Sequence, residues 1–258
     1  MNPAGDGERL PPSTGGVVDF ALAAYAQRAP FYLALALLVF AVGAVVEFAI
    51  PAVPPDTWLG ELKIVLLELS SVFVDSYVVT AVALGVASRL SGETVSTRRL
   101  AGAATERWLA VLAVAMLVQI VIDTTGPLSG FGPLPDHPAL LFLTAPVTWL
   151  VWGMLSLALP IAALSSERAL VAVMLGITRA VTLSLRGPNL LRLCLVAFVT
   201  IVPFMLQEIA LSLMRGHVAR LIFWSSVPLD ALTVGAIAAL QTAFAIDFAR
   251  RAADQRSA

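Results

Sequence analysis

Six stretches of mostly apolar residues, each near the length that crosses a lipid bilayer, dominate this chain of 258 residues. A hydrocarbon core about 30 Å thick needs roughly 20 such residues, because an α-helix rises about 1.5 Å per residue. We therefore predict an all-α, polytopic membrane protein with six transmembrane helices. The predicted spans are residues 31–50, 64–87, 108–122, 139–164, 193–214 and 221–246.

The composition excludes several other classes of protein. Hydrophobic residues make up 59% of the chain, charged residues 13%, and the mean hydropathy is +0.90. Soluble domains have about 45–50% apolar and about 25% charged residues, so an ordinary cytosolic domain and a disordered chain are both excluded. One cysteine and two histidines exclude a disulfide scaffold and a His/Cys metal site. The net charge of −1 argues against nucleic acid as a partner.

The sequence also lacks the short motifs that carry common catalytic chemistry. It contains no H-E-x-x-H, no G-x-S-x-G and no phosphate-binding G-x-x-x-x-G-K-[ST]. No Asp-rich cluster is present that could hold magnesium together with a phosphorylated substrate. We therefore predict a protein that is not an enzyme and uses no cofactor or metal.

Basic residues are distributed very unevenly between the two sides that the six spans define. Cytoplasmic segments of membrane proteins collect Lys and Arg, so we expect both termini to lie in the cytoplasm. One side holds only Lys63, Arg215 and Arg220. The other side holds Arg9, Arg28, Arg89, Arg98, Arg99, Arg107, Arg168, Arg179, Arg186, Arg192, Arg250, Arg251 and Arg256.

Two short tails flank a single predicted membrane domain that covers residues 17–250. Residues 1–16 are rich in Pro, Gly and Ser, and acids stand where a secretion signal needs basic residues. We expect this segment to be a flexible cytoplasmic tail. Residues 251–258 form the predicted cytoplasmic C-terminal tail.

The segment between the fourth and fifth predicted spans has the pattern of a helix at the membrane surface. On a helix of about 100° per residue, Arg168, Arg179, Thr182 and Arg186 share one narrow face, and the rest is mostly apolar. Such a face is typical of an amphipathic helix lying in the cytoplasmic interface, where its arginines contact anionic lipid head groups. The alternative is a helix buried among the spans, with a few arginines reaching the head groups.

A similar element precedes the other outward-going spans, which suggests an internal repeat. Residues 24–28 and 33–39 align with residues 103–107 and 112–118 at a shift of 79 positions. The third copy would lie near residues 186–199. The predicted unit is an interfacial helix followed by an outgoing and a returning span, repeated over residues 17–88, 93–164 and 170–249.

Several short motifs resemble a family of bacterial multi-span proteins. Ala-Leu-Pro-Ile-Ala-Ala-Leu at 158–164 precedes the alanine-containing segment 172–186, and Gly-Pro-Asn-Leu-Leu-Arg-Leu follows at 187–193. This order resembles the membrane domain of glycerophosphoryl diester phosphodiesterases and YciC-type proteins. Residues 91–96 also resemble the inner loop of the same family. The resemblance implies a stand-alone membrane domain in the bacterial inner membrane, because the hydrolase barrel would need about 250 further residues.

Acidic residues inside the predicted spans are the candidates for chemistry, because a charge inside a bilayer is costly. Glu61, Glu68 and Asp75 recur every seven residues on one helical face, and Glu208 lies in the fifth span. Glu68, Asp75 and Glu208 could line a wet cleft that passes protons or cations. Alternatively, each carboxyl faces the bundle interior and is protonated or hydrogen-bonded there.

The predicted function is that of a non-catalytic integral membrane protein associated with lipid or envelope components. Its predicted partners are the bilayer and anionic lipid head groups, contacted by Arg168, Arg179 and Arg186. The first alternative is the permease subunit of an ATP-driven exporter, whose partner would be a separate ATPase. The second is a carrier coupled to protons or cations through the intramembrane acids.

Overall fold

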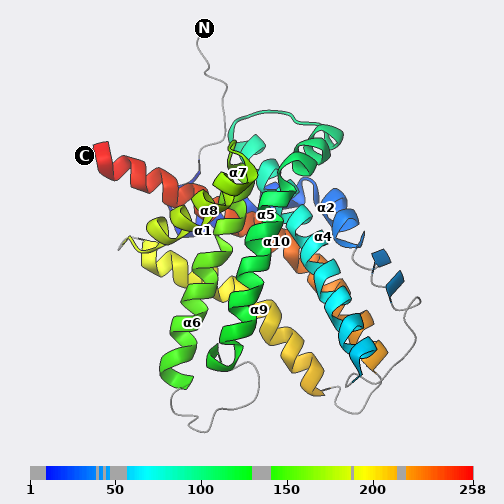
Figure 1. Ribbon diagram of the computed structural model, residues 1–258. Helices are drawn as coiled ribbons and strands as arrows, with labels where there is room; N and C mark the ends of the chain where they lie inside the picture. Colours follow the sequence, from blue (N-terminus) through cyan, green and yellow to red (C-terminus); the bar gives the residue numbers. More distant parts are fainter. Residues whose placement is uncertain are drawn as a thin grey trace.

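The computed structural model describes residues 10–38, 41–42, 45–46, 57–129, 141–186, 189–213 and 219–257. Within these ranges the chain forms helices and no strand, which confirms the predicted all-α class. The helices are α1 (Thr14–Ala26), α2 (Ala29–Ala36), α4 (Trp58–Leu90), α5 (Thr97–Ser129), α6 (Leu141–Ser156), α7 (Ala158–Leu164), α8 (Ala169–Ser184), α9 (Leu190–Leu213) and α10 (Ala219–Ser257) (Figure 1).

Local sequence signals explain where several of these helices begin. The hydroxyl of Ser13 accepts a hydrogen bond from the Gly16 amide at 3.1 Å and caps α1. The hydroxyl of Thr57 accepts one from the Gly60 amide at 3.2 Å and caps α4. Pro30 stands in the first turn of α2; it has no N–H to donate and its ring would clash with the Ala26 carbonyl in a continuous helix, so α1 and α2 are separate helices.

Three helical segments are long and apolar enough to cross a membrane: Leu69–Leu90, Thr97–Thr125 and Leu143–Leu164. They coincide with the second, third and fourth predicted spans, and the third is much longer than the predicted 108–122. The polar residues of 97–107 did not end the helix, because they stand among alanines, which favour helix. The predicted spans 31–50, 193–214 and 221–246 all include residues or side chains outside the described part of the chain.

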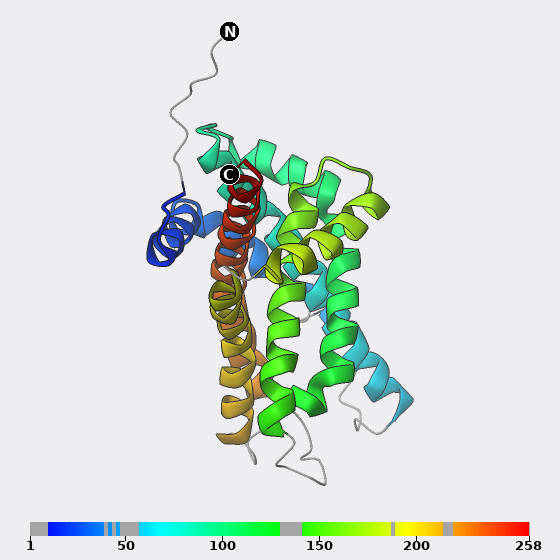
Figure 2. The same ribbon diagram turned by 90° about the vertical axis from the view of Figure 1, so that its left-hand side faces the viewer.

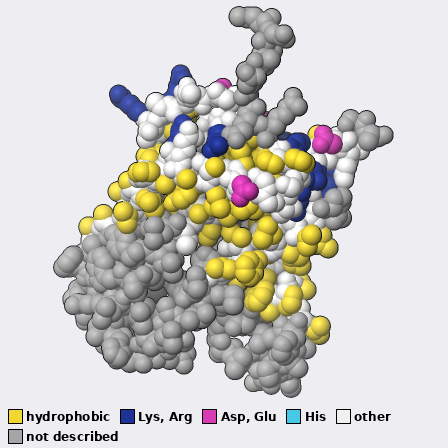
Figure 3. All heavy atoms as spheres, turned by 180° about the vertical axis from the view of Figure 1, so that it is seen from behind, with side chains coloured by type: hydrophobic (Ala, Val, Ile, Leu, Met, Phe, Trp, Pro, Cys, Tyr) yellow, Lys and Arg dark blue, Asp and Glu magenta, His cyan; other side chains and the backbone are white. Residues whose placement is uncertain are grey.

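The outer surface of the bundle is apolar to a degree that water-soluble proteins avoid. Only 28% of the most apolar part of Thr97–Thr125 is buried inside the molecule. Leu109, Met116, Leu117 and Ile120 are exposed at helical spacing on α5. From behind, hydrophobic side chains cover the middle of the molecule, whereas Lys and Arg gather nearer one end (Figure 3). This surface suits contact with lipid chains.

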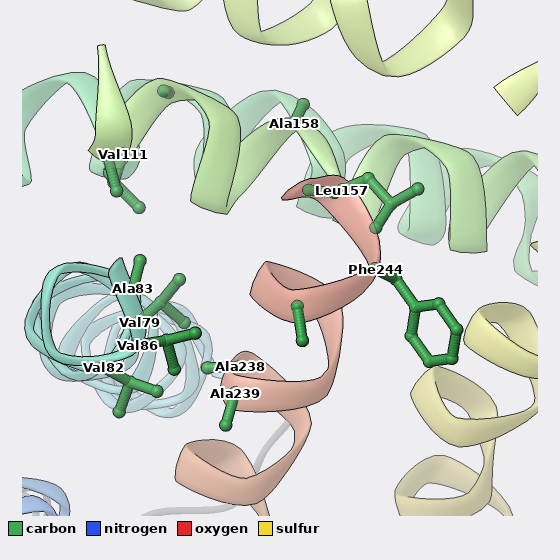
Figure 4. Packing of buried hydrophobic residues seen from close by; sticks show 14 of the residues in the cluster. Val79, Val82, Ala83, Val86, Val111, Leu157, Ala158, Ala238, Ala239 and Phe244 are labelled. Atoms are coloured by element: carbon green, nitrogen blue, oxygen red, sulfur yellow. The ribbon is translucent and has the colours of Figure 1, made fainter. Parts of the chain in front are cut away.

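Small side chains form much of the interior. Val79, Val82 and Val86 of α4 pack near Ala238 and Ala239 of α10 (Figure 4). Short side chains let helix backbones approach closely, which is how helices pack without a strong hydrophobic driving force in lipid. Gly235, Ala239 and Ala243 recur every four residues on α10, and all three are buried, in agreement with this role.

The connections α4–α5 and α7–α8 lie at the same end of the bundle as the described ends of the chain (Figures 1 and 2). Two helices, α1 and α8, lie across this end rather than along the bundle axis. The predicted repeat has such a crosswise helix before each outgoing span. In the second copy, however, the helix runs from Thr97 to Ser129 without the interruption that separates α1 from α2. The repeat thus stays a prediction.

The contact between α6 and α9 gives a direct test of close packing. A Cβ atom at Gly153 would lie 2.6 Å from the Cα atom of Ala197, a backbone atom that cannot move unless the helices separate. We expect Gly153→Ala to lower the free energy of unfolding by about 1–3 kcal/mol in detergent micelles. The control is Gly102→Ala, because no heavy atom lies within 4 Å of that Cβ position. The control should be neutral or slightly stabilising, and equal losses in both variants would contradict this packing.

Candidate functional site

A buried carboxylate organises the charged end of the bundle. Asp247 of α10 is fully buried and pairs with three guanidinium groups. Arg192 of α9 donates to its Oδ2 atom, Arg250 donates to Oδ1 at 2.9 Å, and Arg251 donates to Oδ2 at 2.9 Å. A buried acid is costly unless it is paired and hydrogen-bonded, and this one is saturated with donors.

The same arginines also hold the start of the chain. Arg250 donates to the Leu10 carbonyl at 2.6 Å, and Arg251 and Arg192 donate to the Pro12 carbonyl at 2.7 and 3.1 Å. Leu10 itself is buried in the core. Therefore the tail that the sequence predicts over residues 1–16 is not free of the bundle from Leu10 onward. The predicted C-terminal tail is likewise part of α10, which runs on to Ser257.

The uneven distribution of arginines predicts cytoplasmic charges at these positions, but it does not predict that they form a cluster. One signal was available: Asp247 precedes Arg250 and Arg251 by three and four residues, the spacing at which side chains meet on a helix. The contribution of Arg192 could not be seen, because it lies 55 residues away on another helix.

Other arginines at this end bridge separate segments through backbone carbonyls. Arg28 donates to Val95 at 2.6 Å, and Arg107 donates to Ala163, near the C-terminal end of α7, at 3.2 Å. Arg186 is half-buried and donates to Ala252 at 3.4 Å. Arg186, which the sequence predicts as a lipid contact, is therefore partly engaged inside the protein. These bonds join helices at the bundle end.

Four arginines of the described chain remain exposed, and their guanidinium groups make no hydrogen bond or ion pair. They are Arg98, Arg99, Arg168 and Arg179. An exposed guanidinium with unused donors is suited to bind a phosphate or carboxylate group. Two of the four, Arg168 and Arg179, belong to the face predicted to contact lipid.

Helix α8 places three kinds of side chain around its axis. Its buried face contains Ala172, Val173, Gly176, Ala180 and Ser184. This face lies against α7, since a Cβ atom at Gly176 would be 2.9 Å from the Ala158 carbonyl oxygen. Leu170, Met174 and Leu185 are 77%, 61% and 71% exposed on a second face.

The third face of α8 carries the arginines. At about 100° per residue, Arg168, Arg179 and Thr182 lie roughly a third of a turn from both the buried face and the exposed apolar face. All three are exposed. A helix lying in a membrane interface beside a bundle needs these three faces: one toward protein, one toward lipid chains and one toward head groups.

The structure describes only part of the acidic set. Asp75 is half-buried in α4, and its Oδ2 atom accepts a hydrogen bond from the Ser71 hydroxyl at 3.1 Å. Glu61 is exposed near the start of the same helix. The side chains of Glu68 and Glu208 lie outside the described part, so a common cleft for the three candidate acids stays a prediction. No metal-binding group of His, Cys, Asp and Glu occurs among the residues that the structure describes.

The fold defines a class: an all-helical protein with helices long and apolar enough to be embedded in a membrane. Comparison with known proteins finds no matching family model, curated protein or solved structure. The role of this molecule is therefore inferred from its own geometry and charge.

The central role of Asp247 can be tested by Asp247→Asn. This change keeps the size of the side chain but leaves three guanidinium groups without their carboxylate, so we expect a loss of about 3–5 kcal/mol in the free energy of unfolding. Backbone amides of α1 should also exchange hydrogen faster, because the arginines that hold Leu10 and Pro12 lose their anchor.

Asp19→Asn is the matched control, since Asp19 is an exposed acid on α1. We expect it to change stability by no more than about 0.5 kcal/mol. Normal stability and unchanged amide exchange in the Asp247→Asn protein would show that the cluster does not hold the chain end.

Proposed function

We propose that this chain is a non-catalytic integral membrane protein that binds anionic lipid head groups at its cytoplasmic face. The observation that carries the proposal is the three-faced surface of α8, with exposed arginines on one face and exposed leucine and methionine on another. Each basic residue near an anionic membrane surface contributes about 1 kcal/mol to association.

The proposal includes a six-span topology in the bacterial inner membrane with both termini in the cytoplasm. The distribution of arginines over the sequence supports this orientation. So does the placement of α8 and both described chain ends at the same end of the bundle (Figure 2). Membership in the family of glycerophosphoryl diester phosphodiesterase membrane domains and YciC-type proteins is part of the same proposal, and it rests on the motifs at 158–164 and 187–193.

The lipid-binding role predicts a charge-dependent loss of anionic lipid in the Arg168→Gln/Arg179→Gln double variant. Each substitution removes an exposed guanidinium, so association with phosphatidylglycerol should fall roughly fivefold per site. The measurement is native mass spectrometry of lipid that remains bound after purification from mixed phosphatidylcholine and phosphatidylglycerol.

Two controls separate the effect of the arginines on α8 from the effect of the total charge of the protein. Arg168→Lys/Arg179→Lys keeps both charges and should retain most of the lipid. Lys63→Gln removes a positive charge near the start of α4, outside α8, and should have no effect. Equal lipid retention by the wild type and the Gln double variant would contradict the proposal.

A half-buried acid within an apolar span favours a second candidate, a carrier coupled to protons. Asp75 lies in Leu69–Leu90, and a carboxyl group in such a position is a candidate proton site. Asp75→Asn cannot release a proton, so this candidate predicts at least a roughly tenfold fall in proton flux. The flux is measured in proteoliposomes with an internal pH dye under a potassium diffusion potential.

Glu61→Gln, at the exposed start of the same helix, should leave that flux unchanged. Wild-type proton flux in the Asp75→Asn protein would eliminate the carrier. An ATP-driven exporter would instead show transport only when a separate ATPase is supplied.

A further inference from the structure

The connection between α4 and α5 is shaped by a well-defined helix end. Gly92 has a φ angle of 71°, in the left-handed region that glycine adopts without strain. The Gly92 amide donates to the Arg89 carbonyl at 3.1 Å and the Glu93 amide to the Ser88 carbonyl at 3.0 Å. These two bonds form a Schellman motif, which ends α4 and leads the chain into the non-helical segment 93–96.

Helix α5 begins directly after this segment with two arginines in its first turn. The hydroxyl of Ser96 accepts a hydrogen bond from the Arg99 amide at 3.4 Å and so caps the helix. Arg98 and Arg99 are exposed, and their guanidinium groups have no partner within the described chain. The fixed helix start therefore presents two free guanidinium groups beside the amide groups of its first turn.

These residues surround a hollow in the surface. It is shallow and open to solvent, with a volume of about 480 Å³, and Thr94, Ser96, Arg98 and Arg99 line it. Its lining offers hydroxyl and guanidinium donors, and between Arg89 and Thr105 the single acid is Glu93.

A third guanidinium, that of Arg28, is hydrogen-bonded to the same loop. Arg28 donates from Nη2 to the carbonyl of Val95, the residue between Thr94 and Ser96. Its Nη1 atom is buried and has no hydrogen-bond partner. A buried donor without an acceptor is costly, and a charged donor especially so. Arg28 thus adds a positive charge beside this loop, with one donor that the described chain does not use.

We propose that the hollow lined by Thr94, Ser96, Arg98 and Arg99 binds a phosphate group, either of a lipid head group or of a small soluble phosphate ester. Guanidinium groups bind phosphate oxygens in a bidentate manner, and hydroxyl groups and first-turn amides supply further donors to an oxyanion. This site is separate from the arginine face of α8 and does not depend on it. The protein would then hold phosphate groups at two places on its charged end.

The test uses the full chain in nanodiscs of phosphatidylcholine, with glycerol 3-phosphate as the soluble probe and isothermal titration calorimetry as the measurement. The wild type should bind the probe, and Arg98→Gln/Arg99→Gln should weaken binding roughly tenfold or more. Glu93→Gln should strengthen binding, because it removes a negative charge from the loop. Arg168→Gln/Arg179→Gln is the matched control and should bind like the wild type.

A second set of nanodiscs, containing phosphatidic acid, distinguishes the two sources of phosphate. If the lipid head group fills the hollow, the wild type should bind the soluble probe more weakly in these discs. If the ligand is a soluble phosphate ester, its affinity should be the same in both discs. Both results support the site, provided that Arg98→Gln/Arg99→Gln weakens binding.

Two results would overturn this inference: no binding of glycerol 3-phosphate by the wild type, or equal binding by the wild type and Arg98→Gln/Arg99→Gln. Thermal unfolding of each variant should match the wild type, because neither guanidinium group makes a hydrogen bond or ion pair with another part of the described chain. Failure here would leave the α8 proposal standing, since that proposal is tested through Arg168 and Arg179.

Discussion

The charged end of this molecule depends on the ion pairs that the carboxylate of Asp247 makes. The carboxylate lies fully buried and binds Arg192, Arg250 and Arg251, whose remaining donors hold the backbone at Leu10 and Pro12. The chain start, α9 and α10 thereby become one assembly. Replacement of a whole buried ion cluster by apolar groups is often neutral for stability. Removal of one partner is destabilising, because it leaves a buried charge that nothing compensates.

Ten of the described arginines fall into two groups with different roles. Arg28, Arg107, Arg186, Arg192, Arg250 and Arg251 donate to carbonyl or carboxylate oxygens of the protein. Arg98, Arg99, Arg168 and Arg179 keep their donors free. A count of charges on one side of a membrane mixes the two groups. Of these two groups in the described chain, the second has its donors available to a ligand, and it occurs at the start of α5 and along α8.

Much of the fold follows from local sequence patterns. Runs of apolar residues predict the helices, and the positions of Arg168, Arg179 and Thr182 at helical spacing predict the exposed polar face of α8. Leu170 and Met174 of α8 are exposed, so the described helices do not enclose α8 on every side, and its place in the membrane interface stays a prediction. Periodicity is a local property, so it can be read without knowledge of the tertiary structure.

Features that depend on distant contacts could not be predicted in this way. Arg192 and Asp247 pair across two helices, although they are 55 residues apart in the sequence. Glycine is needed at 153 because Ala197 of another helix lies against it. The bond from Arg186 to Ala252 could not be predicted for the same reason, because Ala252 lies on α10. Helix α5 is longer than the predicted span 108–122, because the helix continues through the charged residues in 97–107.

Helix α8 is proposed to lie between protein, lipid chains and head groups. The most direct test of this placement uses spin labels attached to single cysteines in a Cys194→Ser background, with the protein in liposomes. The measurement is the collision rate of each label with oxygen, which dissolves in the lipid, and with a water-soluble nickel complex. Labels at 170, 174 and 185 should collide mainly with oxygen, and labels at 179 and 182 mainly with nickel. If both sets of positions show the same accessibility, α8 does not lie in the interface and the account is wrong.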